Sequence, residues 1–309
     1  METPLVSICS ITYNHAPFIR QCLDGFLMQQ CNFPIEIIIN DDCSTDGTTE
    51  IIREYAEKYP DKIFPIFHEE NLYSQGVRGM FQKFVFPKAR GKYIALCEGD
   101  DYWTDPLKLQ KQVAFLESHP DYSMCWHKCQ VLRPDGQFSI DDFDFLEKRE
   151  YGFEEIALKW SVPTASMVYR STILPKIPQN KNFAFGDNVV IFTCALEGRI
   201  YCLGETMSVY RKHAGGWTAQ APLLGLTERF IHHNKALMES FPESMHYVFR
   251  KMLADNYIYL QRMIYSSRPI YTIKLLFEAF RLCRTEYLSR VRATTRNRVL
   301  ILLCDTFLR

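Results

Sequence analysis

The sequence predicts an α/β fold in which a mostly parallel sheet is flanked by helices. In the first hundred residues, short apolar runs alternate with segments whose apolar residues recur at helical spacing. The apolar runs are hydrophobic at nearly every position, which is typical of parallel strands buried on both faces. Hydrophobic residues make up 47% of the 309 residues, and 36 Lys and Arg balance 36 Asp and Glu. This composition indicates a globular protein and excludes a disordered chain or one that strongly attracts nucleic acid.

Strands and helices alternate up to about residue 120. The expected strands are Val6–Ile11, Ile35–Ile39, Ile63–Phe67 and Tyr93–Cys97. The expected helices are Ile19–Leu27, one that begins after a capping Asp46, Val77–Phe84, and one that opens at Asp105-Pro106 and stops at Pro120. This succession of strand and helix favours a parallel sheet with helical crossovers.

The pattern changes after Pro120. Strand-like pieces are expected at Ser123–Val131, Ala165–Tyr169, Ile200–Leu203 and Thr206–Tyr210, with a helix at Asn188–Leu196. From about Leu226 the pattern is helical. We therefore divide the chain into a domain at residues 1–220 and a helical C-terminal extension at residues 221–309.

Charge is unevenly spread between these parts. From Gln261 to the end the chain carries 10 Lys/Arg against 3 Asp/Glu, a net charge of +7, which leaves −7 for residues 1–260. Residues 251–307 combine aromatic and aliphatic residues with several arginines, among them Arg284 and Arg298. This combination is typical of a basic amphipathic helix that lies on an anionic membrane surface or docks against a partner. The alternative is packing on the rest of the chain with a solvated basic face.

Cysteine usage indicates a reducing, cytoplasmic compartment. The 11 Cys residues are scattered without CxxC spacing, and several lie inside apolar runs. The first ten residues lack the pattern of a signal peptide, and no window reaches the roughly 18 apolar residues of a membrane span. The nearest approach, Val299–Cys304, is too short.

Acidic residues follow two of the expected strands directly. Asp41-Asp42 and Asp100-Asp101 lie at strand ends, where open parallel sheets bind ligands. Adjacent carboxylates are stabilised by a hard divalent cation such as Mg²⁺ or Mn²⁺, and a carboxylate can also accept from a nucleobase or a ribose hydroxyl. A solvated turn in front of the capping Asp105 is the alternative for Asp100-Asp101.

The absence of other motifs argues against several classes of protein. The chain has neither GxGxxG nor GxxxxGK, which argues against a dinucleotide dehydrogenase and a P-loop NTPase. The segment Cys125–Cys129 lacks a fourth zinc ligand. The acidic run Asp141–Asp144 is interpreted as a solvated loop.

Three motifs in order resemble the family 2 glycosyltransferases of the GT-A fold. They are Ser7-Ile8-Cys9-Ser10-Ile11-Thr12-Tyr13-Asn14, Ile37-Ile38-Ile39-Asn40-Asp41-Asp42-Cys43-Ser44-Thr45-Asp46-Gly47-Thr48 and Glu98-Gly99-Asp100-Asp101. Phe185-Gly186-Asp187-Asn188 and Met207-Ser208-Val209-Tyr210-Arg211-Lys212-His213-Ala214-Gly215-Gly216 look like acceptor-side motifs of a bacterial branch. The resemblance covers about residues 4–220. The QxxRW motif of processive synthases is absent, so the non-processive branch is expected.

The resemblance implies a nucleotide-sugar site. Residues implied to hold the base and ribose are Thr12, Tyr13, Asn14 and Asp42. By the same resemblance Asp100 and Asp101 form a DxD-like motif for Mn²⁺ or Mg²⁺, with Asp101 favoured as the direct ligand. A metal held there would neutralise the charge that develops on the diphosphate as the sugar–phosphate bond breaks.

Two further residues have open interpretations. Arg78 could add positive charge near the phosphates or lie on a solvated helix face. His213, in a Gly-flanked loop, could close over the diphosphate, assist the metal, or make only a local hydrogen bond.

Asp187 is the candidate catalytic base. In an inverting transfer a carboxylate takes the proton of the attacking hydroxyl, and the resemblance assigns that group to this motif. Because Asp187 precedes an expected helix, a capping role is the alternative. Trp160, Pro163–Ser166 and Trp217 could line an acceptor groove or pack in the interior.

These observations together predict a metal-dependent, inverting hexosyltransferase that moves one sugar to a saccharide or lipid-linked glycan, as in surface polysaccharide biosynthesis. It would be cytoplasmic, or peripheral on the inner face of the plasma membrane. A nucleotidyltransferase is disfavoured because the segment from Thr12 to Pro17 offers no glycine and no Lys or Arg. A catalytically silent scaffold that binds a partner through its helical tail stays open.

Overall fold

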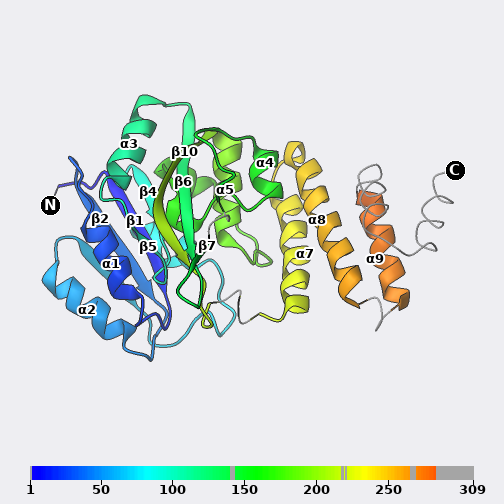
Figure 1. Cartoon of the computed structure of the whole chain (residues 1–309), viewed down its shortest axis with the longest axis horizontal. Helices are drawn as coiled ribbons and strands as arrows, with labels where there is room; N and C mark the ends of the chain where they lie inside the picture. Colours follow the sequence, from blue (N-terminus) through cyan, green and yellow to red (C-terminus); the bar gives the residue numbers. More distant parts are fainter. Residues whose placement is uncertain (1, 140–142, 217–218, 220, 265–268, 283–309) are drawn as a thin grey trace. The chain divides into compact units, whose positions relative to one another are not determined.

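A ten-stranded mixed sheet dominates the computed structural model, which describes residues 2–139, 143–216, 219, 221–264 and 269–282 (Figure 1). Among these residues the strands are β1 (Val6–Thr12), β2 (Ile35–Asp41), β3 (Ile63–Phe67), β4 (Tyr93–Leu96), β5 (Tyr102–Trp103), β6 (Tyr122–Leu132), β7 (Phe138–Ser139), β8 (Arg149–Glu150), β9 (Val168–Arg170) and β10 (Arg199–Arg211). Their order is β3-β2-β1-β4-β9-β6-β10-β5, with β7 beside β6 and β8 beside β10.

The first half of the sheet is parallel and buried. β1 pairs in parallel with β2 and β4, and β2 with β3. Val6 and Ile8 on β1 and Ile37 and Ile39 on β2 have almost no exposed surface. The near-continuous apolar runs of the sequence therefore become parallel strands covered on both faces.

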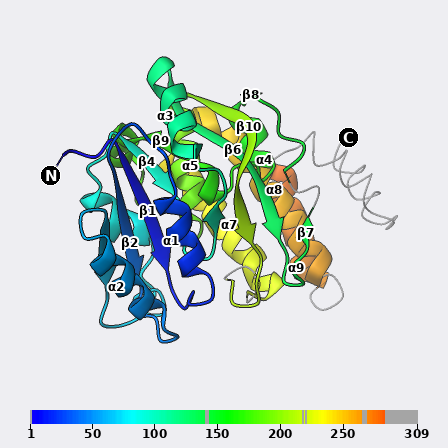
Figure 2. The same cartoon turned by 60° about the vertical axis from the view of Figure 1, so that its left-hand side comes forward.

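Three helices bury their apolar residues in one core with these strands. They are α1 (Ile19–Leu27), α2 (Thr48–Lys58) and α3 (Lys108–Ser118). Leu23 and Phe26 of α1, Ile52 of α2 and Leu116 of α3 belong to the same buried cluster as Val6. In Figure 2, α1 lies in front of the sheet.

The second half of the sheet is mixed. β9 runs antiparallel to both β4 and β6, and β6 pairs in parallel with β10. The helix α5 (Gly186–Glu197) packs on β6 and β10, and the short α4 (Phe153–Leu158) packs on α5. The 3-10 helices at Thr164–Ser166 and Ser171–Lys176 flank β9.

Four sequence expectations need correction. The segment expected as the helix Val77–Phe84 forms a π-helix at Phe81–Val85 and a 3-10 turn at Phe86–Lys88. The two strands expected at Ile200–Leu203 and Thr206–Tyr210 are one strand, β10, with register shifts near Thr206. Gly47, at φ 100°, occupies the cap position of α2, and Asp46 lies one residue earlier, where its Oδ1 accepts the N–H of Thr48 at 3.1 Å. Ala165 lies in a 3-10 turn ahead of β9.

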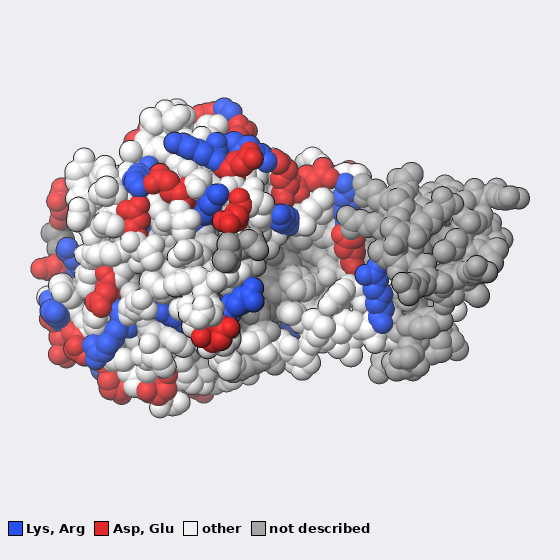
Figure 3. Space-filling model, viewed as in Figure 1, with Lys and Arg blue, Asp and Glu red and all other residues white. Residues whose placement is uncertain are grey.

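Residue contacts divide the chain into two units. The first comprises Met1–Pro178 and Phe185–Ala219, and the second comprises Gln179–Ala184 and Gln220–Arg309. On the face of the molecule shown in Figure 3, acidic and basic side chains of the first unit are interspersed. Exposed ion pairs such as Arg199 with Asp121 also join opposite charges in this unit.

Helices make up most of the described part of the second unit. They are α7 (Leu223–Ser240), α8 (Glu243–Ile264) and α9 (Pro269–Leu282), and α8 packs against both others. Ile264, Leu275 and Ala279 lie in a core cluster of this unit. No helix among the described residues combines the length and apolar character that crossing a membrane requires. Tail residues after 282 that the sequence interpretation used, including Arg284 and Arg298, lie outside the described residues, as do Asp141, Asp142 and Trp217.

Candidate active site

The carboxyl ends of β1, β2 and β4 bring three polar loops to one edge of the sheet. Thr12 at the end of β1 pairs with Asp41 at the end of β2. β4 lies on the other side of β1, and Glu98-Gly99-Asp100-Asp101 follows it. The motifs that the sequence placed at strand ends are therefore neighbours, as an open parallel sheet requires.

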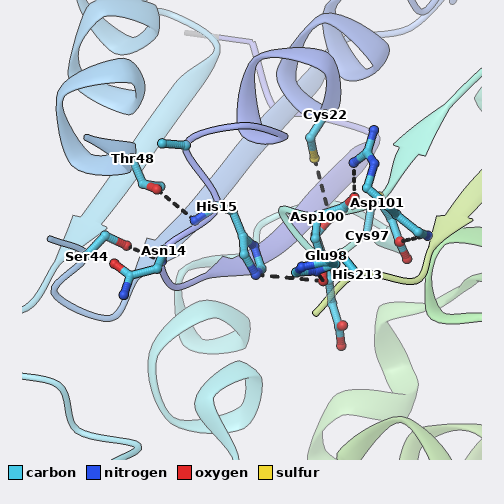
Figure 4. A network of polar contacts seen from close by, with 12 residues as sticks. Asn14, His15, Cys22, Ser44, Thr48, Cys97, Glu98, Asp100, Asp101 and His213 are labelled. Atoms are coloured by element: carbon cyan, nitrogen blue, oxygen red, sulfur yellow. Dashed lines mark hydrogen bonds and ion pairs between the residues drawn. The ribbon is translucent and has the colours of Figure 1, made fainter. Parts of the chain in front are cut away.

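Asp100 lies between two histidines from distant parts of the chain. Its Oδ2 is 3.1 Å from Nε2 of His213 and 3.7 Å from Nε2 of His15. One ligand atom of each residue lies within 4.8 Å of the others, so the three could hold one metal ion. Figure 4 shows both rings directed at the Asp100 carboxylate.

The electrostatics of this cluster favour an ionised aspartate and a neutral imidazole. Burial lowers the pKa of His15, and the charge of Asp100 only partly offsets it. Although burial acts in the other direction, the hydrogen bond with His213 lowers the pKa of Asp100. Oδ1 of Asp100 is buried and has no hydrogen-bond partner among the residues that the structure describes. A cation would satisfy this oxygen.

Gly99 allows the first histidine to approach Asp100. A Cβ at this position would lie 2.7 Å from the side chain of Thr12 and 3.1 Å from Nδ1 of His15. Thr12 is itself 4% exposed. Any side chain at position 99 would therefore displace the β1 loop from the β4 loop.

Asp101 has a different environment from Asp100. It is 1% exposed, and its Oδ1 accepts the backbone N–H of Arg211 at 2.8 Å. Burial and the charge of Asp100 raise its pKa. The Arg211 guanidinium donates to the Asp100 carbonyl and to Gln21, and it lies over the ring of Phe18. Asp101 thus joins β10 to the β4 loop, and the side chain that meets the histidines is Asp100.

Two more carboxylates belong to this region. Burial, together with the charges of Asp100 and Asp187, raises the pKa of Glu98 to about 8. Asp187 lies in the first turn of α5, where burial raises its pKa and the backbone N–H of Asn188 opposes this shift. The charge of Asp187 thus acts on Glu98 in the loop after β4, while its carboxylate also interacts with the first turn of α5.

The β1 loop is fixed by side chains of the β2 loop. The backbone N–H groups of Asn14 and His15 donate to Ser44 Oγ and Thr48 Oγ1, each at 2.8 Å. Oδ1 of Asn14 accepts from the N–H of Thr45 at 2.8 Å, while Asn14 itself has φ 54°. Asn14 therefore holds loop backbone, and the side chain of Tyr13 beside it is 43% exposed.

The remaining expected donor-site residues also make structural contacts. The two oxygens of Asp42 accept the backbone N–H groups of Leu72 and Tyr73 at 2.9 and 3.0 Å. The guanidinium of Arg78 lies 4.1 Å from the ring centroid of Tyr73 and donates to backbone carbonyls. Asp42 thus draws the segment after β3 toward the strand ends, and Arg78 belongs to that same segment.

Sequence reasoning missed three residues of this region. His15, Glu98 and Arg211 were not singled out as site residues, although each lies inside a quoted motif or directly after one. His15 follows Asn14 in a strand-end loop, and that position was the available signal. Arg211 is the last residue of β10 and precedes His213 by two residues. Nothing in the sequence around it indicates that its backbone N–H donates to Asp101.

An aromatic group lies near the start of the β9 region. The Trp160 ring is 4.8 Å from Phe143 and 5.2 Å from Tyr210, and the residue is 47% exposed. Ala165 and Ser166, by contrast, are fully buried. Among the expected acceptor residues that the structure describes, Trp160 is the one whose aromatic ring is exposed.

Comparisons with known proteins identify relatives and structural neighbours. The family model described as Glycosyl transferase family 2 matches residues 7–194. The uncharacterized protein Rv1520 of Mycobacterium tuberculosis is 43% identical over 212 residues, which cover 68% of this chain and 60% of that protein. The uncharacterized glycosyltransferase alr2836 of Nostoc sp. is 30% identical over 218 residues, covering 67% of this chain and 65% of that protein. The chain thus spans about 60% of the length of the first of these relatives.

Two solved structures show the same fold. Staphylococcus aureus TarS 1-349, in complex with UDP-GlcNAc, aligns with a TM-score of 0.64 at 21% identity, over 92% of this chain and 83% of that one. The mannosyltransferase PcManGT from Pyrobaculum calidifontis, in complex with GDP-Man and Mn²⁺, aligns with a TM-score of 0.57 at 15% identity, over 99% and 80%. These likenesses confirm the predicted α/β architecture.

Proposed function

Because the chain belongs to glycosyl transferase family 2 and has its GT-A fold, we propose that it transfers a single sugar from a nucleoside-diphosphate sugar to a saccharide or lipid-linked glycan. One observation carries this proposal. Asp100 meets His213 at the carboxyl edge of the sheet, and the charges of Asp100 and Asp187 both act on Glu98. That arrangement supplies a cation site and a base to one region.

The donor diphosphate would lie at the end of β4. A divalent cation held there by Asp100 and His213 would neutralise the charge that develops on the diphosphate oxygens. The orphaned Oδ1 of Asp100 and the two nearby imidazoles fit such an ion. We place the ion on Asp100 rather than on Asp101, because Asp101 is committed to the Arg211 backbone. The base and ribose would lie along the β1 loop, beside the exposed Tyr13.

Asp187 would act as the general base. Its carboxylate takes the proton of the acceptor hydroxyl while the hydroxyl oxygen bonds to the anomeric carbon. The bond from that carbon to the diphosphate oxygen breaks, and the nucleoside diphosphate leaves with inversion. Burial raises the pKa of Asp187, which makes its carboxylate a stronger base than an exposed aspartate.

The acceptor is proposed to be a saccharide. The open ring of Trp160, supported by Phe143 and Tyr210, offers an apolar face on which a sugar ring can stack. Relatives named for surface polymers, such as the putative teichuronic acid biosynthesis glycosyltransferase TuaG of Bacillus subtilis, are compatible with this choice. Peripheral binding to an anionic membrane through the C-terminal helices would suit a lipid-linked acceptor. Absence of the full chain from sedimented anionic vesicles at low salt would contradict that part.

The first test is release of nucleoside diphosphate from a panel of UDP-, GDP-, dTDP- and CMP-sugars, for wild type and Asp187→Asn. CMP release is followed for the last donor. We expect one donor to be turned over with metal and not with EDTA. Asp187→Asn should lower the rate by about 10² to 10⁴-fold, the usual contribution of a general base. The amide can still accept the Asn188 N–H, so the fold should be kept.

Asp121→Asn is the matched control, because it makes the same chemical change in an exposed ion pair with Arg199. It should leave turnover unchanged. If turnover needs an acceptor that is not known, binding of each donor can still be measured as a shift in the melting temperature of the protein. No metal-dependent stabilisation by any donor would reject the enzyme and favour the scaffold.

A further inference from the structure

The cluster at Asp100 contains a second histidine, His15, beside His213. His15 and His213 present Nε2 atoms 3.7 and 3.1 Å from the same oxygen of Asp100. An ion about 2.1 Å from each donor separates two donors by roughly 3 to 4.2 Å. The two distances to Asp100 lie in this range, and all three ligand atoms lie within 4.8 Å of one another, so small rotations would bring the three side chains onto one ion.

The positions of both rings are fixed by the fold. The backbone N–H of His15 donates to Thr48 Oγ1, and Gly99 leaves room for its ring. The His213 ring packs 4.6 Å from Phe18 and edge-on to His15 at 5.9 Å. The side chains of His15 and His213 are only 16% and 14% exposed. Such rigid placement is what a metal site needs.

The donor set is informative about the ion. Two imidazole nitrogens and one carboxylate oxygen suit first-row transition ions, whereas Mg²⁺ prefers oxygen ligands and retains its waters. Three coordination positions of an octahedral ion would stay open for diphosphate oxygens or water. A site made of two carboxylates alone would not bind Mn²⁺ in preference to Mg²⁺ for this reason.

We propose that His15 is a direct metal ligand together with Asp100 and His213, and that this trio makes the site selective for Mn²⁺ or a similar transition ion over Mg²⁺. The inference rests on the proposed function for the role of the ion, but the ligand set can be tested without any sugar donor. Three protein ligands should bind Mn²⁺ in the absence of nucleotide.

The test is a Mn²⁺ titration of the full chain followed by electron paramagnetic resonance, with pulsed detection of nitrogen couplings. Wild type should bind one Mn²⁺ with couplings to two imidazole nitrogens. His15→Gln should retain one coupling and bind Mn²⁺ at least about tenfold more weakly, while weak Mg²⁺ binding changes little. His119→Gln, which changes a histidine stacked on Phe115 at the end of α3, is the matched control and should behave as wild type.

Two results would overturn the inference. One is a wild-type spectrum with fewer than two nitrogen couplings, or no Mn²⁺ binding without nucleotide. The other is a His15→Gln spectrum that still has both couplings. An intact two-nitrogen Mn²⁺ signal without any donor turnover or donor binding would instead reject the proposed function and leave the metal site standing. Turnover supported equally by Mg²⁺ and Mn²⁺ would reject the selectivity alone.

Discussion

The adjacent residues Asp100 and Asp101 have side chains with different contacts. The carboxylate of Asp100 meets two histidines and has one unpartnered oxygen, whereas that of Asp101 is buried against the Arg211 N–H. The resemblance to the family favoured Asp101 as the direct ligand, and this assignment stays a prediction beside the alternative that Asp100 holds the ion. The direction of a side chain from an irregular loop depends on contacts with β10, which are remote in sequence.

This difference predicts unequal effects of the same substitution. Asp100→Asn removes the charged ligand, so metal-dependent donor turnover should fall by at least about 10²-fold. Asp101→Asn keeps an oxygen that accepts the Arg211 N–H, so turnover should fall by no more than about tenfold. Steady-state rates at saturating Mn²⁺, with melting temperatures of both variants, decide this. A larger loss for Asp101→Asn at unchanged stability would return the ligand role to Asp101.

At the scale of single elements, α3 carries an unusual buried cation. Lys108 is fully buried, donates to Gln112 Oε1 at 2.7 Å, and lies 4.0 Å from the ring centroid of Trp103. Burial lowers its pKa from 10.5 to about 7. Below pH 7 the lysine is charged in both the folded and unfolded states, so folding incurs the full desolvation cost.

Above that pH the folded protein releases the Lys108 proton while the unfolded chain keeps it until about pH 10.5. This residue therefore makes the free energy of unfolding rise with pH across that window. Lys108→Met should remove this contribution, so its stability advantage over wild type should be larger at pH 6 than at pH 9, by on the order of 2 kcal/mol. Urea denaturation of both proteins at the two pH values measures it. An equal difference at both values would contradict the assigned pKa.

The same scale shows which parts of the fold could be predicted. The apolar runs predicted β3 at its observed bounds and β1, β2 and β4 to within two residues, because buried parallel strands leave a local signal. Ala165 was expected in a strand and lies in a 3-10 turn, and the short β5 and β8 were missed. Their pairing with β10 depends on remote partners. For the same reason the strand-end carboxylates could be found from sequence, but the meeting of His15 with His213 could not.

At the scale of the whole molecule, the chain leaves the first unit at Gln179 and returns at Phe185. This excursion is held by α7. Nδ1 of His233 accepts the N–H of Ala184 at 3.3 Å, and Asn180 donates to Glu239 and Ser240. Burial lowers the pKa of His233 to about 3, so the acceptor nitrogen is unprotonated at neutral pH. Asp187 follows Ala184 by three residues.

We therefore expect His233→Leu to loosen residues 179–187 and to lower turnover several-fold through Asp187, with donor KM little changed. His233→Asn, whose side-chain oxygen can accept the same N–H, should restore most of the rate. Hydrogen exchange of peptides covering residues 179–187, together with kcat and KM, tests this. His232→Leu, at the exposed neighbouring position, is the control. If His233→Leu had the same hydrogen exchange and the same turnover rate as wild type, Asp187 would be positioned without the help of α7.

The path of the chain between the units also limits how the protein can be recombined. A single crossover point after Ala219 separates the helices α7, α8 and α9 from the first unit. It leaves Gln179–Ala184, which belong to the second unit, in the same piece as the first unit. A chimera that exchanges only the C-terminal helices with those of a relative would pair a native excursion with a foreign α7. Exchange of the two segments together preserves their shared contacts. The helices and the excursion should therefore be inherited as one module, and a library of swapped tails should yield active enzymes mainly when both crossover points are used.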